Sequence, residues 1–225
     1  MSARHIEALE TKKTAELQIS AKEVVLDGAL TMPESASKLV LFAHGSGSSR
    51  HSPRNQFVAQ KLNDAGLATL LFDLLTPEEE AVDLRSAQHR FDIHLLADRL
   101  VHATQWARQN ENTRQFRLGY FGASTGGAAA LVAAAELPRE VDAVVSRGGR
   151  PDLARDALPH VRAPTMLIVG GEDHVVIGLN KQARMQMRCE VKLEIVPAAT
   201  HLFEETGALE RVAELAAGWF LMKLG

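Results

Sequence analysis

The sequence predicts a single-domain α/β protein with a mostly parallel, doubly wound sheet and an antiparallel pair of strands at the N-terminal edge of that sheet. Short, continuously apolar runs alternate with longer segments of helical spacing, as expected where helices cover both faces of a parallel sheet. No linker rich in Pro, Gly or Ser and no repeat of fixed period interrupts the alternation. We therefore expect one domain over residues 15–225, preceded by a polar tail over residues 1–14.

The expected strands are of two kinds. Residues 15–20 and 23–32 alternate in part between polar and apolar side chains and are expected to form the antiparallel edge pair. The parallel strands are expected at residues 38–43, 68–73, 116–121, 141–146, 165–170 and 191–197. Helical spacing or composition predicts helices at residues 55–65, 89–109, 125–137, 177–187 and 209–224. Residues 74–88 are expected to form the longest irregular connection, either a flap over the site or a plain solvated loop.

The composition excludes several functional classes. The 225 residues carry 25 Lys and Arg against 28 Asp and Glu, so the formal net charge of −3 does not favour nucleic-acid binding. The longest run of small apolar residues, over residues 126–135, is roughly half of what a bilayer span requires, so no membrane segment is expected. The single cysteine, Cys189, and an N-terminus without a visible secretion signal predict a cytoplasmic protein.

A serine stands where an expected strand gives way to an expected helix. Gly122, Ser124 and Gly126 form the pattern G-x-S-x-G between the apolar run 116–121 and the Ala-rich segment 127–135. In such a turn the serine backbone is strained, and the hydroxyl projects above the sheet beside the N-terminus of the helix. The pattern also fits a glycine-rich packing turn with an incidental serine. A catalytic role for Ser124 therefore requires a base elsewhere in the chain.

A candidate base and a carboxylate to orient it follow at the ends of later strands. Ligands bind at the carboxyl ends of parallel strands, and Asp173 and His201 come soon after the last two expected strands. The order Ser124, Asp173, His201 is that of a serine triad built on such a sheet. Glu172 is a competing carboxylate, but adjacent side chains of an extended segment point to opposite faces, and we prefer Asp173.

Acyl transfer also needs two N–H donors for the oxyanion that develops. One is the backbone N–H of Thr125, directly after the serine, and the other lies in the loop after the first parallel strand, where Ser46 is our candidate. Gly45-x-Gly47 in that loop lacks the third glycine of a dinucleotide-binding loop. The nine histidines include no H-E-x-x-H pattern, so neither a metal nor an organic cofactor is expected.

Together these residues resemble the α/β-hydrolase superfamily and, within it, the dienelactone-hydrolase-like branch. The resemblance extends from about residue 15 to residue 224 and is carried by the segments 41–47, 122–126, 171–173 and 199–203. It implies an α/β-hydrolase fold and hydrolysis of small carboxylic esters through an acyl-enzyme, with thioesters and lactones as related substrates. True dienelactone hydrolases use a cysteine nucleophile where Ser124 stands in this chain.

Two features bear on the substrate. Many lipases insert a cap where this chain has only residues 147–164, so we expect an open site without a cap domain. Arg50 and Arg147 follow expected strands at the same edge, and they either hold an anionic group of the substrate or form structural ion pairs with carboxylates such as Asp73.

The leading prediction is a serine hydrolase that acts on a small-molecule ester. Two alternatives stay open, because a fold does not determine a function. One is a non-catalytic scaffold that binds a small molecule, and the other is an acyltransferase or peptidase that uses the same triad. No partner beyond the substrate is predicted, and the oligomeric state is left open.

Overall fold

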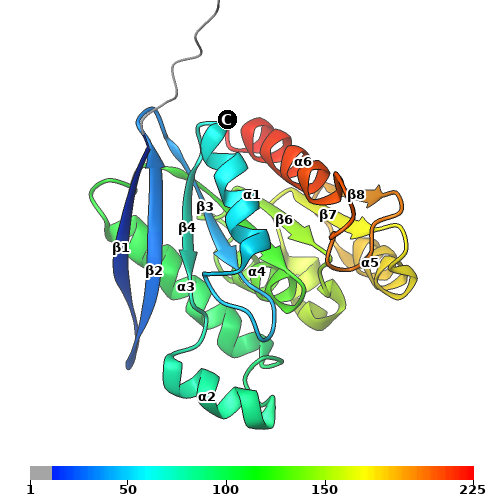
Figure 1. The fold of residues 1–225 in the computed structure, drawn as a ribbon, viewed down its shortest axis with the longest axis horizontal. Coiled ribbons are helices and arrows are strands. Elements are labelled where there is room, and N and C mark those ends of the chain that lie inside the picture. The colour runs from blue at the N-terminus through cyan, green and yellow to red at the C-terminus, as the bar shows by residue number, and fades with distance from the viewer. Residues whose placement is uncertain (1–11) are drawn as a thin grey trace, which may run out of the picture.

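An eight-stranded sheet runs through the computed structural model, which describes residues 12–225 (Figure 1). The strands are β1 Lys12–Ala21, β2 Val24–Pro33, β3 Lys38–Ala43, β4 Ala68–Phe72, β5 Arg117–Ala123, β6 Ala143–Arg147, β7 Thr165–Gly170 and β8 Val191–Val196. Their order in the sheet is β1-β2-β4-β3-β5-β6-β7-β8. β2 is antiparallel to both β1 and β4, whereas β3 to β8 pair in parallel. The predicted sheet with its antiparallel N-terminal pair is therefore confirmed.

Helices cover the two faces of this sheet, and the sheet separates two apolar cores (Figure 1). α1 Pro53–Asp64 and α6 Ala208–Lys223 pack together on one face, whereas α3 Ile93–Gln109 and α4 Thr125–Glu136 pack together on the other. Along β3, Leu39 and Leu41 face the α3/α4 core, and Val40 and Phe42 face the α1/α6 core. A strand buried on both faces needs apolar residues at every position, which explains its continuous apolar run.

The N-terminal strand is longer than the sequence suggests. β1 begins at Lys12 rather than at residue 15, and its register pairs Lys12 with Pro33 of β2. Residues 1–11 of the expected polar tail lie outside the described residues.

Residues 74–88 are not irregular, because they contain helix α2, Pro77–Ser86. The Thr76 hydroxyl accepts the Glu79 N–H at 3.2 Å, and the Glu79 carboxylate accepts the Thr76 N–H at 2.9 Å. This capping box, with Pro77 in the first turn, is a sequence-level helix start that the prediction overlooked. The prediction of an irregular connection is therefore wrong.

The segment between β6 and β7 holds no cap domain. It contains η1 Pro151–His160, two short 3-10 turns joined at a kink at Arg155, which packs against α4 and against α5 His174–Gln186. Among the helices of residues 12–225, none is long and apolar enough to cross a bilayer. The carboxyl edge of the sheet is thus left uncapped by any insertion at this point.

Candidate active site

Ser124 occupies the turn between β5 and α4, as the sequence predicts. Its backbone has φ 51° and ψ −120°, a conformation that costs a non-glycine residue about 1–3 kcal/mol. The Ser124 N–H donates to the C=O of Arg147 at 3.2 Å, which ties the turn to the end of β6. The packing around this turn maintains the strained conformation, which places the serine side chain at the carboxyl edge of the sheet.

The glycines on either side of Ser124 permit contacts between backbones. A Cβ at Gly122 would lie 2.5 Å from the Gly126 carbonyl oxygen, and a Cβ at Gly126 would lie 2.1 Å from that of Ala43. Both distances are shorter than any real Cβ contact, and the atoms met belong to backbone that cannot rotate away. The G-x-S-x-G pattern therefore reflects the close packing of β3, β5 and α4 around the serine.

Asp173 and His201 meet at the same edge of the sheet. Asp173 Oδ2 lies 2.6 Å from His201 Nδ1, with the two side chains 14% and 39% exposed. Glu172 instead lies 3.9 Å from His174, and both of those side chains are exposed. The structure therefore brings Asp173 to the histidine and directs Glu172 elsewhere.

His201 also lies close to the serine turn. Gly148 directly follows Arg147, the residue that accepts the Ser124 N–H, and a Cβ on Gly148 would lie 3.5 Å from His201 Cε1. Among the described residues no hydrogen bond joins Ser124 Oγ to His201. Such bonds in ligand-free sites commonly tighten only when substrate binds. Ser124, Asp173 and His201 thus lie at the same edge of the sheet, and their catalytic roles stay a prediction.

The two candidate oxyanion donors flank Ser124. Thr125 is the first residue of α4, so its N–H has no acceptor within the helix. Ser46 lies in the loop after β3, where a Cβ on Gly45 would be 3.2 Å from the Ser124 Cβ. Within residues 12–225 the Ser46 N–H has no hydrogen-bond acceptor. Both N–H groups are therefore available near the point where an oxyanion would form.

His44 holds this loop in place, a role that the sequence analysis missed. The buried imidazole accepts the Leu74 N–H on Nε2 at 3.0 Å, so Nδ1 carries the proton and donates to the Gly45 C=O at 3.0 Å. Burial lowers the pKa of His44, although the hydrogen bond to Gly45 and the charges of Asp73 and Glu80 oppose this shift. The sequence feature that could have indicated this role is the His-Gly pair directly after a buried strand.

Stability should fall in mildly acidic solution because of His44. Its pKa is lowered in the folded protein, so below about pH 6.5 the unfolded chain binds a proton that the folded chain does not. We expect His44→Gln to lower the free energy of unfolding at pH 7.5 by about 1–3 kcal/mol. Between pH 7.5 and pH 5.5 the free energy of unfolding should fall less in this variant than in wild type. Urea unfolding at both pH values measures this, with exposed His174→Gln as the control. An equal decrease in the free energy of unfolding between pH 7.5 and pH 5.5 in wild type and in His44→Gln would contradict this role of His44.

The two arginines suggested for substrate binding are placed differently. Arg50 forms an ion pair with Asp73 and also donates its backbone N–H to that carboxylate at 2.7 Å, which is the structural alternative left open by the sequence. Arg147 is buried and donates to Asn55 Oδ1 at 3.4 Å, while its Nε and Nη1 have no hydrogen-bond partner in the described part of the chain. Burial, and secondly the charge of Arg54, lower the pKa of Arg147 to about 10.

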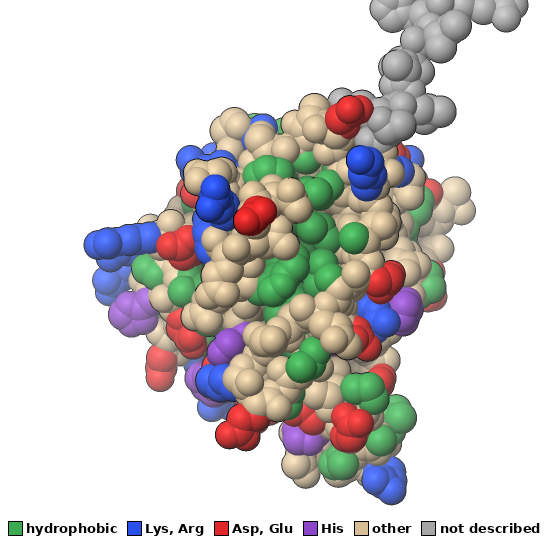
Figure 2. Space-filling view, turned by 90° about the vertical axis from the view of Figure 1, so that its left-hand side faces the viewer, with side chains coloured by type: hydrophobic (Ala, Val, Ile, Leu, Met, Phe, Trp, Pro, Cys, Tyr) green, Lys and Arg blue, Asp and Glu red, His purple; other side chains and the backbone are tan. Residues whose placement is uncertain are grey.

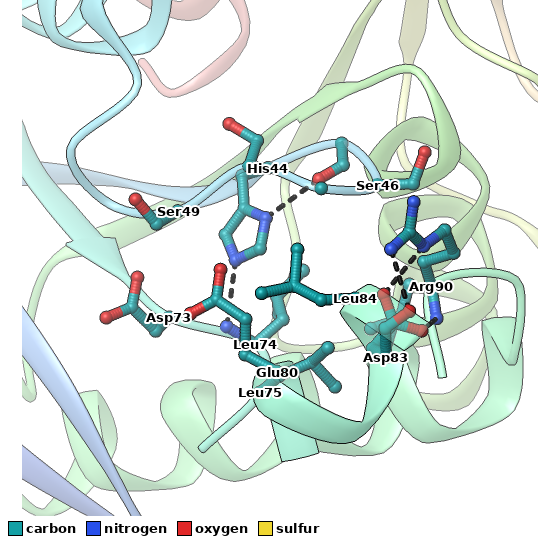
Figure 3. Close-up of a pocket in the computed structure, with 14 residues that line it drawn as sticks. His44, Ser46, Ser49, Asp73, Leu74, Leu75, Glu80, Asp83, Leu84 and Arg90 are labelled. Atoms are coloured by element: carbon teal, nitrogen blue, oxygen red, sulfur yellow. Dashed lines mark hydrogen bonds and ion pairs between the residues drawn. The ribbon is translucent and has the colours of Figure 1, made fainter. Parts of the chain in front are cut away.

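A pocket opens beside the loop that carries Ser46 (Figure 3). It is lined by residues 44–49, by residues 73–75 after β4, by α2 and by side chains at and before the start of α3. Across residues 12–225 no three His, Cys, Asp or Glu side chains gather in a group that could hold a metal ion.

Comparison with known proteins assigns the family. The chain matches the model of the dienelactone hydrolase family over residues 26–219. It is 59% identical to a crystal structure of dienelactone hydrolase from Anabaena variabilis ATCC 29413, with a TM-score of 0.94 and coverage of 95% of this chain and 99% of that chain. Est1E from Butyrivibrio proteoclasticus is 18% identical with a TM-score of 0.77, covering 92% of this chain and 98% of that chain, and shows likeness of fold alone.

Two curated relatives come from Mycobacterium tuberculosis strains CDC 1551 / Oshkosh and ATCC 25618 / H37Rv, and both are provisionally named phosphoribosyl transferase. Each is 57% identical over 206 residues, which are 92% of this chain and 46% of the relative, so the chain spans about half the length of those proteins. The family model, the Anabaena structure and the observed fold agree on a fold of the hydrolase type. The chain therefore belongs to the dienelactone hydrolase family.

Proposed function

We propose that the protein hydrolyses small carboxylic esters through an acyl-enzyme on Ser124. The observation that carries this proposal is the strained Ser124 at the sheet edge where Asp173 and His201 share a hydrogen bond of 2.6 Å. A protein that only binds a small molecule gains nothing from that strain, which has a use when a nucleophile must be presented. Thioesters and lactones would react in the same way.

The reaction would proceed in two matched halves. His201 Nε2 removes the Ser124 proton as Oγ attacks the ester carbonyl, and the N–H groups of Ser46 and Thr125 stabilise the oxyanion. His201 then gives that proton to the leaving alcohol oxygen as its bond to the acyl carbon breaks. Asp173 holds the proton of His201 on Nδ1 and stabilises the imidazolium cation.

Water would complete the cycle. His201 is 39% exposed, so a water molecule can reach it once the alcohol has left. The water loses a proton to His201, attacks the acyl carbon and releases the acid as Ser124 recovers its proton. A cytoplasmic setting is part of the proposal, since a sequence with one cysteine has no intrachain disulfide to depend on.

Labelling with a fluorophosphonate probe tests the proposal directly. We expect wild type to react, Ser124→Ala and His201→Ala to lose labelling, and kcat/KM on a short ester to fall by about 10⁴-fold or more in both. Ser86→Ala, at the exposed end of α2, is the matched control and keeps both activities. Undiminished labelling of a folded Ser124→Ala protein would exclude Ser124 as the nucleophile.

A further inference from the structure

We propose that β8 is a dimer interface, at which the strand pairs antiparallel with β8 of a second copy of this chain. β8 is the last strand of the sheet, and within residues 12–225 no other strand covers its outer edge (Figure 1). An open edge offers N–H and C=O groups that can bind a further strand. Three properties of β8 point to a second copy as that strand: the direction of its backbone groups, the order of its charges and the exposure of its apolar side chains.

The hydrogen bonds to β7 determine which backbone groups of β8 are free. The Thr165 N–H donates to the Glu190 C=O, and the Gly171 N–H donates to the Val196 C=O. Because the bonds of a parallel ladder use every second residue of a strand, the even-numbered residues of 190–196 bind β7. The N–H and C=O groups of residues 191, 193 and 195 therefore point outward, away from β7.

These outward groups allow a symmetric antiparallel pair centred on Leu193. A two-fold axis at this residue places Leu193 opposite the second copy's Leu193, and Val191 opposite the second copy's Ile195. In antiparallel strands, residues that face each other with their backbone groups directed at the partner exchange both N–H···O=C bonds. Pairing in this register would therefore use every outward N–H and C=O of residues 191–195.

The charges of β8 favour the same register. Lys192 and Glu194 lie on one face of the strand, where they form an ion pair at 2.8 Å. Pairing centred on Leu193 brings Lys192 directly opposite the second copy's Glu194, and Glu194 opposite its Lys192. The nearest shifts that still pair the outward groups are centred on Lys192 or on Glu194, and each of them brings like charges together. The strand is thus complementary to itself in charge as well as in its backbone.

Apolar side chains are accessible along the same edge. Ile195 is 39% exposed, and Val191 and Leu193 are half-buried, on the face of β8 opposite Lys192. Contacts between these side chains across the two strands would remove apolar surface from water. On the other face, Lys192 lines a groove together with Met222 of α6, which is 69% exposed, so apolar surface borders the strand there too.

The opposite end of the sheet is open as well. Figure 2 shows this end, where β1 is the outer strand and charged side chains surround a central apolar area. Lys12 and Lys13 are adjacent on β1, and Lys12 forms an ion pair with Asp64 of the same chain at 2.9 Å. β1 provides a matched control, because an exposed lysine can be reversed in charge on either edge strand: Lys13 on β1 and Lys192 on β8.

Charge reversal tests the interface by sedimentation velocity over a series of protein concentrations. We expect wild type to form a dimer, and Lys192→Glu, which places like charges opposite each other, to raise the dimer dissociation constant about tenfold or more. Adding Glu194→Lys to that variant brings opposite charges together again and should restore the dimer. Lys13→Glu changes the net charge equally and should leave the dimer intact.

Ile195→Pro tests the backbone pairing separately from the charges. It removes an N–H that points outward and none that binds β7, so the protein should keep its circular dichroism spectrum and sediment as a monomer. Wild type that is monomeric at every concentration would overturn the proposal and point to another protein as the occupant of this edge. So would a dimer that Lys13→Glu dissociates and Lys192→Glu does not, because the interface would then be β1. A dimer that the double variant fails to restore would overturn the register centred on Leu193.

Discussion

Asp173→Asn is expected to lower kcat on a short ester by about 10³- to 10⁴-fold without unfolding the protein. The Asp173 carboxylate lies 2.6 Å from His201 Nδ1 and can only accept a hydrogen bond, so it holds the proton on Nδ1 and leaves Nε2 as the base. An asparagine amide can donate to Nδ1 instead, which places the proton on Nε2 and removes the charge that stabilises imidazolium. Steady-state kinetics with circular dichroism as a check on folding measure the effect.

Glu172→Gln is the matched control for this substitution. Glu172 is the neighbouring acidic residue, but it lies 3.9 Å from His174 and both side chains are exposed. We expect its kcat to stay within about twofold of wild type, because exposed ion pairs contribute little. A large loss in Glu172→Gln with a small loss in Asp173→Asn would reverse the assignment of the orienting carboxylate.

The sheet could be predicted from the sequence because its strands are buried on both faces. Residues 39–43 alternate between the two cores, with Leu39 and Leu41 in one and Val40 and Phe42 in the other, so every position has to be apolar. The serine turn could also be predicted, because close packing restricts which residue types fit there. Contacts between backbones at Gly122 and Gly126 leave no room for any side chain, so the packing requires glycine at both positions.

Apart from the overlooked capping box at its start, α2 has little apolar pattern in the sequence, because its stabilising contacts are not apolar. Asp83 is buried in mid-helix and is held by the Arg90 side chain and by two backbone N–H groups beyond the helix end. A sequence shows an aspartate among glutamates there, which is typical of a solvated segment. That carboxylate can be buried only because residues 87–90 turn back against the helix and bind it.

The environments of the arginines also depended on tertiary packing. Ser146 faces the α4 side, where a Cβ on Gly127 would lie 2.5 Å from its Oγ, so alternation along β6 directs Arg147 to the opposite face. That face could be inferred from the strand, but the position of Asn55 on α1 could not. Burial of Arg147 without a carboxylate is a property of how α1 packs on the sheet.

Gly126→Ala is expected to lower the free energy of unfolding by about 3 kcal/mol and to reduce activity as well. The added Cβ would lie 2.1 Å from the Ala43 carbonyl oxygen and 2.5 Å from that of His44, so α4 or the end of β3 has to move. Because only Gly45 separates His44 from Ser46, that movement displaces the candidate oxyanion donor. Urea unfolding and kcat on a short ester measure the two effects.

Gly218→Ala is the control that separates this clash from a general effect of replacing glycine. Gly218 lies inside α6, and no heavy atom is within 4 Å of a Cβ built there. Alanine is the better helix former, so Gly218→Ala should raise the free energy of unfolding by about 0.5–1 kcal/mol and leave kcat unchanged. If both variants shifted stability in the same direction, the approach of α4 to the end of β3 would not be the reason that position 126 is glycine.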